Sequence, residues 1–145
     1  MDRGLISTRY ARSLLDYAIS LDQQDEVYER MKTVSEVFWE VPEVRIALTN
    51  TSIRLDERLK IFFTSTGGNI PSSLVKMADM IFHNEREDLI QYIALRYIEL
   101  YRDRFKILHG KITTAVPFDK KDSNSFQKRI QKLVGENLEL EPVVD

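Results

Sequence analysis

The sequence predicts a mainly α fold: a six-helix N-terminal bundle followed by an incomplete small α/β region. Up to about residue 106, apolar residues recur at spacings of three and four, which is the pattern of amphipathic helices. From Leu108 onward, β-branched residues become frequent and alternate, which is typical of strands. We therefore expect two domains, spanning residues 1–106 and 107–145. The chain has no cysteine, so its core depends on packing alone.

Six helices are expected before residue 106, each placed by its start and stop signals. Ser7 or Thr8 can cap the first helix, which is expected to reach about Leu21. Pro42 separates the second helix from a short third one, and the Gly67-Gly68 pair ends the fourth. The second to fifth helices are expected at about 25–41, 43–48, 55–65 and 71–83.

The sixth helix is expected to begin at Asn84. Asn84 and Glu87 have the spacing of a variant capping box, which would satisfy free backbone amides at that end. Its apolar stripe is formed by Ile90, Ile93, Tyr97, Leu100, Tyr101 and Phe105.

The tail is expected to form a strand at 112–116, closed by Pro117, then a helix ended by Gly135. A second strand is expected from Leu138. Fewer than about 40 residues follow the boundary, too few to fold alone in most cases. This region therefore resembles the front half of an α/β domain, either cut short or completed elsewhere. The helix between the strands is predicted from Phe126, Ile130, Leu133 and Val134.

The first and fifth helices are more apolar than a surface helix needs to be. A single buried stripe is about 100° wide, yet at 100° per residue the apolar arc of each helix spans roughly 200°. Tyr10 and Tyr17 lie at one edge of the first arc, and Met77 and Met80 lie at one edge of the second. Methionine is common on surfaces that receive amphipathic helices.

Two such arcs suggest that each helix serves two contacts, one with the core of the domain and one with a partner helix. The alternative is that both helices are simply central in the bundle. The sequence leaves the choice between these two explanations open.

Charge and composition exclude several classes of function. The formal net charge is −2, so no basic excess favours binding to nucleic acid. The N-terminus lacks a signal-peptide pattern, and no apolar run is long enough for a membrane helix. We therefore expect a chain that does not insert into the membrane directly.

No arrangement of residues predicts catalysis, a cofactor or a metal. His83 and His109 lack nearby ligands at helical spacing, and Gly67-Gly68 lacks the lysine of a phosphate loop. Glu85, Glu87 and Asp88 suit a helix start better than acid/base chemistry. The basic residues of the tail are typical of a solvated face or of a patch for an acidic partner. They are Lys120, Lys121, Lys128, Arg129 and Lys132.

Three segments carry a family resemblance. Residues 6–18 (ISTRYARSLLDYA) resemble the first helix, residues 80–89 (MIFHNEREDL) the junction of the fifth and sixth helices, and residues 108–116 (LHGKITTAV) the following strand of the delta subunit of bacterial F-type ATP synthase. This family includes the mitochondrial oligomycin-sensitivity-conferring protein. Family members continue beyond the equivalent of residue 145 with a glycine-rich strand and a last helix.

The resemblance implies a non-catalytic stator subunit that links the catalytic head of the synthase to its peripheral stalk during proton-driven ATP synthesis. The N-terminal domain would bind the N-terminal helix of one alpha subunit between its first and fifth helices. The C-terminal region would hold the peripheral-stalk b subunits, on the cytoplasmic face of the bacterial inner membrane. Carried over to this sequence, the groove residues are Tyr10, Ser13, Leu14, Tyr17, Met77 and Met80.

A second hypothesis, from a different class, is a small helical RNA-binding or antitermination-type regulator, because small helical bundles also serve that role. The acidic charge balance argues against it. An enzyme is a third hypothesis, for which no catalytic residues can be nominated.

Overall fold

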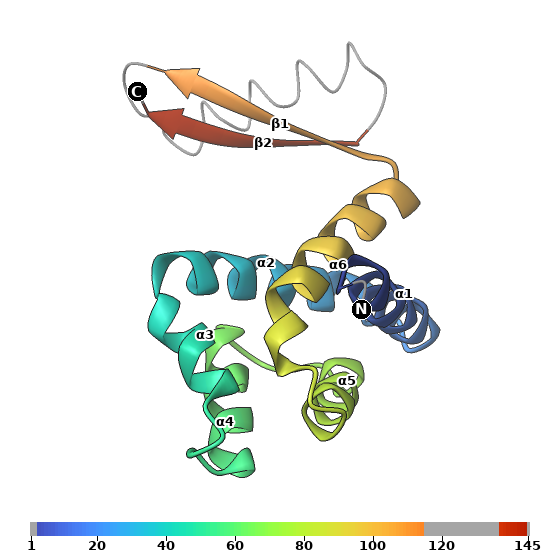
Figure 1. The fold of residues 1–145 in the computed structure, drawn as a ribbon. Coiled ribbons are helices and arrows are strands. Elements are labelled where there is room, and N and C mark those ends of the chain that lie inside the picture. The colour runs from blue at the N-terminus through green and yellow to red at the C-terminus, as the bar shows by residue number, and fades with distance from the viewer. Residues whose placement is uncertain (1–2, 115–136, 145) are drawn as a thin grey trace. The chain divides into compact units, whose positions relative to one another are not determined.

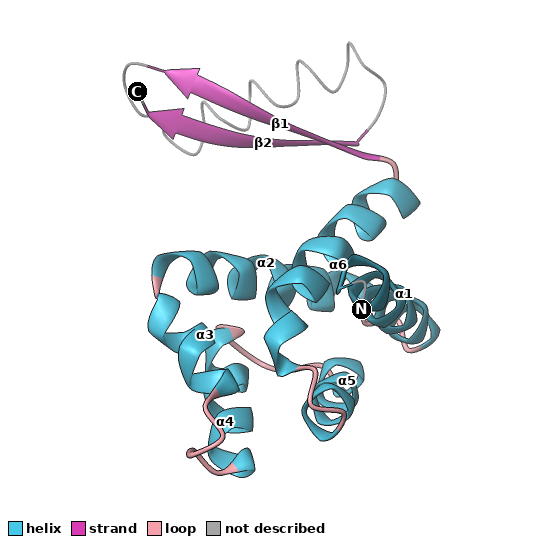
Figure 2. Ribbon diagram, viewed as in Figure 1, coloured by secondary structure: helices cyan, strands magenta, loops and turns pink. Residues whose placement is uncertain are grey.

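The computed structural model of the chain describes residues 3–114 and 137–144 (Figure 1). Six α-helices and one short 3₁₀ helix, η1, are followed by two strands in this described part. Helices dominate, as Figure 2 shows, which confirms the mainly α fold predicted from the sequence. Two compact units are present, the first ending at Tyr101 and the second beginning at Arg102. The helices are α1 (Arg3–Ser20), α2 (Gln24–Glu40), α3 (Pro42–Thr49), α4 (Leu55–Ser65), α5 (Ser72–His83), η1 (Glu87–Leu89) and α6 (Ile90–Arg104).

The core of the first unit follows from the periodicity of the sequence. In α2 the residues at spacings of three and four are all buried, and they face α1, α3 and α4. This apolar face stabilises the helix mainly by burial, because helices of this length are marginal alone. The buried residues of α2 are Val27, Tyr28, Met31, Val34 and Phe38.

The predicted cap of the first helix was wrong. Helix α1 is already helical at Arg3, and Ser7 lies within it, fully buried. The Thr8 hydroxyl donates a hydrogen bond to the Gly4 carbonyl oxygen, one turn earlier in the same helix, at 2.8 Å. A hydroxyl residue can bond to its own helix in this way, so its position in the sequence does not distinguish a cap from a helix interior.

The predicted capping box at Asn84 and Glu87 was also wrong, and the sixth helix does not begin at Asn84. Asn84 follows the last residue of α5, and α6 begins only at Ile90, after η1. Glu87 instead forms an ion pair with Arg58 at 3.0 Å, with both side chains only 11% exposed. The long-range contact took the glutamate away from its local role.

Arg58 joins three parts of the bundle. Besides its pair with Glu87, its guanidinium donates hydrogen bonds to the carbonyl oxygens of Ile53 and Leu48, at 3.1 and 3.3 Å. It therefore holds η1 and the α3–α4 connection against α4. Because a buried charge is costly when its partner is removed, this cluster stabilises the fold only as a unit.

The Gly67-Gly68 pair ends α4, as predicted. Gly67 has φ +81°, a conformation that L-residues rarely adopt. Its amide donates to the Thr64 carbonyl oxygen at 3.2 Å, which closes the end of the helix. A side chain at Gly68 would collide with the Arg30 guanidinium, which donates to the Thr66 carbonyl oxygen.

The second unit contains two parallel strands, β1 (Ile107–Thr114) and β2 (Asn137–Val144). Ile107 pairs with Asn137 and Thr114 pairs with Val144 at the two ends of the ladder. The first strand begins about five residues earlier than predicted, so its 112–116 bounds were wrong at the start. The helix predicted from Phe126 to Val134, and Pro117, lie outside the described residues.

Candidate functional site

Only the middle of the wide apolar arc of α1 is buried. Ala11, Leu14, Leu15 and Ala18 are at most 3% exposed, and at 100° per residue they span about 100°, the width of one buried stripe. Tyr10 and Tyr17, at one edge of the arc, are only partly buried, and Ser13 is exposed beside them. The core of the domain therefore uses about half of the apolar arc.

Helix α5 shows the same division. Leu74, Met77, Ala78 and Ile81 are buried, with Met77 5% exposed. Met80 lies at the edge of the arc, and 48% of its surface is exposed. Both helices thus leave one apolar edge in contact with solvent.

Three contacts show that these two edges lie together, with the helices antiparallel. The Asn84 side-chain amide donates to the Tyr10 hydroxyl at 2.9 Å at one end. The Lys76 ammonium lies 5.4 Å from the centre of the Tyr17 ring in the middle. We call this surface, formed by the exposed edges of the two helices, the α1/α5 face.

Gln23 closes the other end of the α1/α5 face. Its side-chain oxygen accepts a hydrogen bond from the Ser73 backbone amide at 2.9 Å, and its amide donates to the Ser72 hydroxyl at 3.0 Å. Asn84 and Gln23 therefore tie the two helices at both ends of the face. Figure 1 shows α1 and α5 as neighbours, and they pack directly on each other.

All six residues predicted for the groove lie on these two helices, at two depths. Leu14 and Met77 are buried beneath the surface, where they serve the core as well. Tyr10, Ser13, Tyr17 and Met80 reach the surface. The sequence gave no sign of the ties made by Gln23 and Asn84, because both join positions more than 45 residues apart. Asn84 in particular was interpreted as a local helix cap.

The arrangement offers apolar and hydrogen-bonding surface but no reactive group. Among the described residues, no three His, Asp or Glu side chains gather closely enough to hold a metal ion. Likewise, none of the helices described is long and apolar enough to cross a membrane. What the α1/α5 face can do chemically is bury part of another apolar surface.

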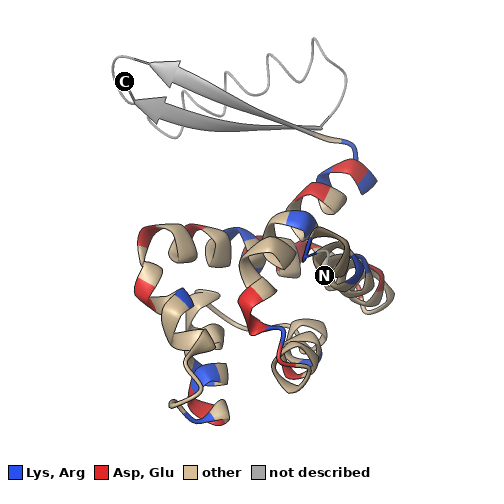
Figure 3. Cartoon of the chain, viewed as in Figure 1, with Lys and Arg blue, Asp and Glu red and all other residues tan. Residues whose placement is uncertain are grey.

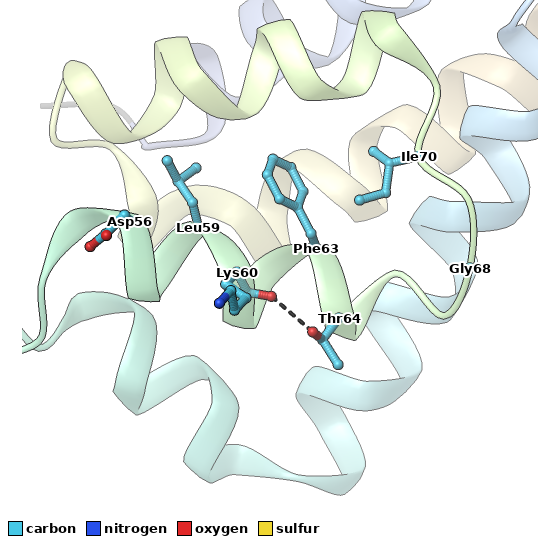
Figure 4. A pocket seen from close by; sticks show the side chains of 7 residues that line it. All are labelled: Asp56, Leu59, Lys60, Phe63, Thr64, Gly68 and Ile70. Carbon is cyan, nitrogen blue, oxygen red and sulfur yellow. Dashed lines mark hydrogen bonds between the residues drawn. The ribbon is translucent and has the colours of Figure 1, made fainter.

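A shallow hollow of about 640 Å³ lies elsewhere, between α4 and the loop that follows it. Figure 4 shows Leu59, Phe63 and Ile70 along its apolar side. The Thr64 hydroxyl donates to the Lys60 carbonyl oxygen at 2.9 Å and is occupied within its own helix. No acid or base pair converges on this hollow, so its geometry indicates no reaction.

Comparison with known proteins agrees with the order of the elements. The sequence model described as ATP synthase delta (OSCP) subunit matches residues 6–145. The chain belongs to the ATP synthase delta (OSCP) subunit family. It is similar to the ATP synthase subunit delta of Bacteroides thetaiotaomicron, with 33% identity over all of this chain and 79% of that protein. It is also similar to that of Phocaeicola vulgatus, with 31% identity over 98% of this chain and 77% of the relative.

More distant members of the family cover the same length. The ATP synthase subunit delta of Prochlorococcus marinus is 26% identical over 97% of this chain and 78% of that protein. As a member of the delta (OSCP) family, the chain is a stator subunit of an F-type ATP synthase, a structural part of a membrane-associated complex. The family resemblance seen in the sequence is thereby confirmed.

Proposed function

We propose that the α1/α5 face binds the N-terminal helix of one alpha subunit, so that the chain holds the catalytic head of the synthase. The observation that carries this proposal is the coincidence of the two exposed apolar edges. Met80 is half exposed on α5, beside the partly buried Tyr10 and Tyr17 of α1. A tyrosine at such an edge can bury its ring while its hydroxyl stays in water.

The dimensions of the face fit a short helix. Helix α5 has 12 residues, about 18 Å at 1.5 Å per residue. A partner helix of about three turns would cover that length, with its apolar side on Tyr10, Tyr17 and Met80. Since Asn84 and Gln23 already fix the two helices in place, binding would need little rearrangement and would lose little conformational freedom.

The remaining parts of the proposal concern the other partner and the location. The second unit, from about residue 107, would hold the peripheral-stalk b subunits. The chain would then lie peripherally on the cytoplasmic face of a bacterial inner membrane. Its role is mechanical, because a head that turned with the rotor could not use torque to make ATP. On this proposal the chain has no catalytic residues.

Two substitutions on the face test this proposal. Met80→Asp and Tyr10→Asp each place a charge where an apolar contact is expected, so affinity should fall by about 30-fold or more, as at an interface hot spot. The measurement is calorimetry of the chain with a peptide of the alpha subunit's N-terminal helix. Helical circular dichroism should stay unchanged, because neither side chain is fully buried.

Leu95→Asp is the matched control. Leu95 on α6 is 43% exposed, close to the 48% of Met80, and it does not belong to the α1/α5 face. This variant should bind the peptide normally. Undiminished binding by both Met80→Asp and Tyr10→Asp would exclude the face as the alpha-subunit site. No observation favours the RNA-binding hypothesis, and the family assignment takes its place.

A further inference from the structure

A second apolar surface lies at the corner between α2 and α3. Within the eight residues 39–46, Trp39 is 82% exposed, Ile46 is 63% exposed and Val41 is 42% exposed. Trp39 is also the only tryptophan of the chain. We call this surface, defined by Trp39, Val41 and Ile46, the corner face.

The exposure of these side chains does not come from poor packing of the corner. Phe38, next to Trp39, is 1% exposed, and Leu48, at the end of α3, is fully buried. Helix α3 packs on α2, α4 and η1. The inner side of the corner is therefore well packed, and only the outer side presents large apolar groups. An exposed cluster of this kind marks an interaction surface.

The charges around the corner face select the kind of partner. Glu36, Glu40 and Glu43 are exposed, and none of them forms an ion pair within the described residues. Arg45 is the one basic residue between positions 36 and 46. Figure 3 shows the acidic residues along the outer end of α2 and the start of α3.

The nearest lysine of α2 is already engaged. The Lys32 ammonium pairs with Glu29 at 3.0 Å and lies 4.5 Å from the centre of the Tyr28 ring. It therefore leaves the carboxylates of the corner uncompensated. The exposed tryptophan and the surrounding negative charge together match an amphipathic segment that carries Lys or Arg beside its apolar stripe.

We infer that the corner face binds a basic amphipathic segment of another subunit of the synthase, separately from the α1/α5 face. A second copy of this chain would bring the same three carboxylates together, and an anionic lipid surface would repel them. This inference needs only that the chain works within a complex. It does not depend on which helix occupies the α1/α5 face.

The single tryptophan provides a direct test. The chain is labelled with 5-fluorotryptophan and added to ATP synthase from which this subunit has been removed, and the single fluorine resonance is followed. Coverage of Trp39 should shift and broaden the resonance. An unchanged resonance while sedimentation shows that the chain is bound would overturn the inference. Failure of binding through the α1/α5 face is recognised separately, as a loss of affinity in Met80→Asp.

The charge of the partner is tested with Glu36→Gln, Glu40→Gln and Glu43→Gln combined. Binding of this variant to the depleted synthase should weaken by about tenfold at low salt and should depend less on salt, because complementary charges at an interface are screened. Glu26→Gln with Glu57→Gln is the control, since both residues are exposed elsewhere. Equal affinity and equal salt dependence for the triple variant and the original chain would overturn the basic partner.

The other possible occupants are tested with the same label. Self-association of the chain that disappears in Trp39→Ala would assign the corner face to a second copy and overturn the inference. A shift of the resonance with anionic phosphatidylglycerol vesicles alone would assign it to lipid and overturn it equally. A monomeric chain whose resonance ignores vesicles but responds to the depleted synthase is the expected result.

Discussion

Two pairs of helices in the first unit use tyrosine in opposite ways. Between α2 and α6, Tyr97 is fully buried and its hydroxyl donates to the Gln24 carbonyl oxygen at 2.8 Å. Tyr28 and Tyr101 stack there with ring centres 3.9 Å apart. On the α1/α5 face, Tyr10 and Tyr17 are only partly buried. The same residue type closes one pair of helices and leaves the other open to a partner.

The difference lies in what satisfies the hydroxyl groups. The Tyr101 hydroxyl donates to the Asp25 carboxylate at 2.6 Å, so both inner tyrosines of α6 bond to the start of α2. The Tyr10 hydroxyl instead accepts from an exposed amide, that of Asn84. A sealed tyrosine needs a protein partner because burying an unpaired polar group is costly. A tyrosine at an edge can use water, and its ring stays available for binding.

The largest expected effect separates the two pairs by stability. Tyr97→Ala should lower the free energy of unfolding by about 3–5 kcal/mol, as for other buried aromatic residues. Tyr17→Ala, its counterpart on the α1/α5 face, should lower it by only about 1 kcal/mol, because less of its surface is buried. Urea unfolding followed by circular dichroism measures both values. Equal losses would mean that the α1/α5 face is part of the core.

The next effect appears at alkaline pH. Burial raises the pKa of Tyr97 above its ordinary value of 10.0, and the nearby Tyr101 and Asp25 add to the shift. The folded protein therefore keeps a proton that the unfolded chain loses, so this contribution to stability is complete below pH 10 and declines as the pH rises further. The slope expected from Tyr97 is about 1.4 kcal/mol per pH unit.

Tyr97→Phe isolates that contribution. It should lose about 1 kcal/mol at neutral pH with the hydrogen bond to Gln24. Above pH 10 its stability should fall less steeply than that of the original chain, since phenylalanine has no proton to lose. Unfolding curves at several pH values give both slopes. Identical slopes would contradict the assignment of the alkaline loss to Tyr97.

The smallest effect concerns the two ties of the α1/α5 face. Asn84→Ala and Gln23→Ala each remove an exposed or partly exposed hydrogen bond, so each should cost about 0.5 kcal/mol of stability. If the ties hold the face ready for a helix, affinity for the alpha-subunit peptide should fall by about threefold as well. Calorimetry measures this, with the exposed Asn69→Ala as control. Unchanged affinity in both variants would show that the ties serve the fold alone.

The prediction of the elements succeeded where the pattern was local and repeated. The residues of α2 at spacings of three and four are the buried ones, and α4 ends before the positive φ of Gly67. It failed at Ser7 and at Asn84, where one polar residue can take several partners. Ser7 is a buried helix residue, and Asn84 bonds to Tyr10, 74 positions away.

The sequence by itself determined the helices, their apolar arcs and the family, because hydrophobic periodicity and short motifs are properties of neighbouring residues. Only the tertiary structure decided which half of each arc is buried. Leu14 and Met77 are in the core and Met80 is at the surface, although all three are equally apolar in the sequence. The reason is that burial depends on which helices pack together, and those contacts join residues far apart along the chain.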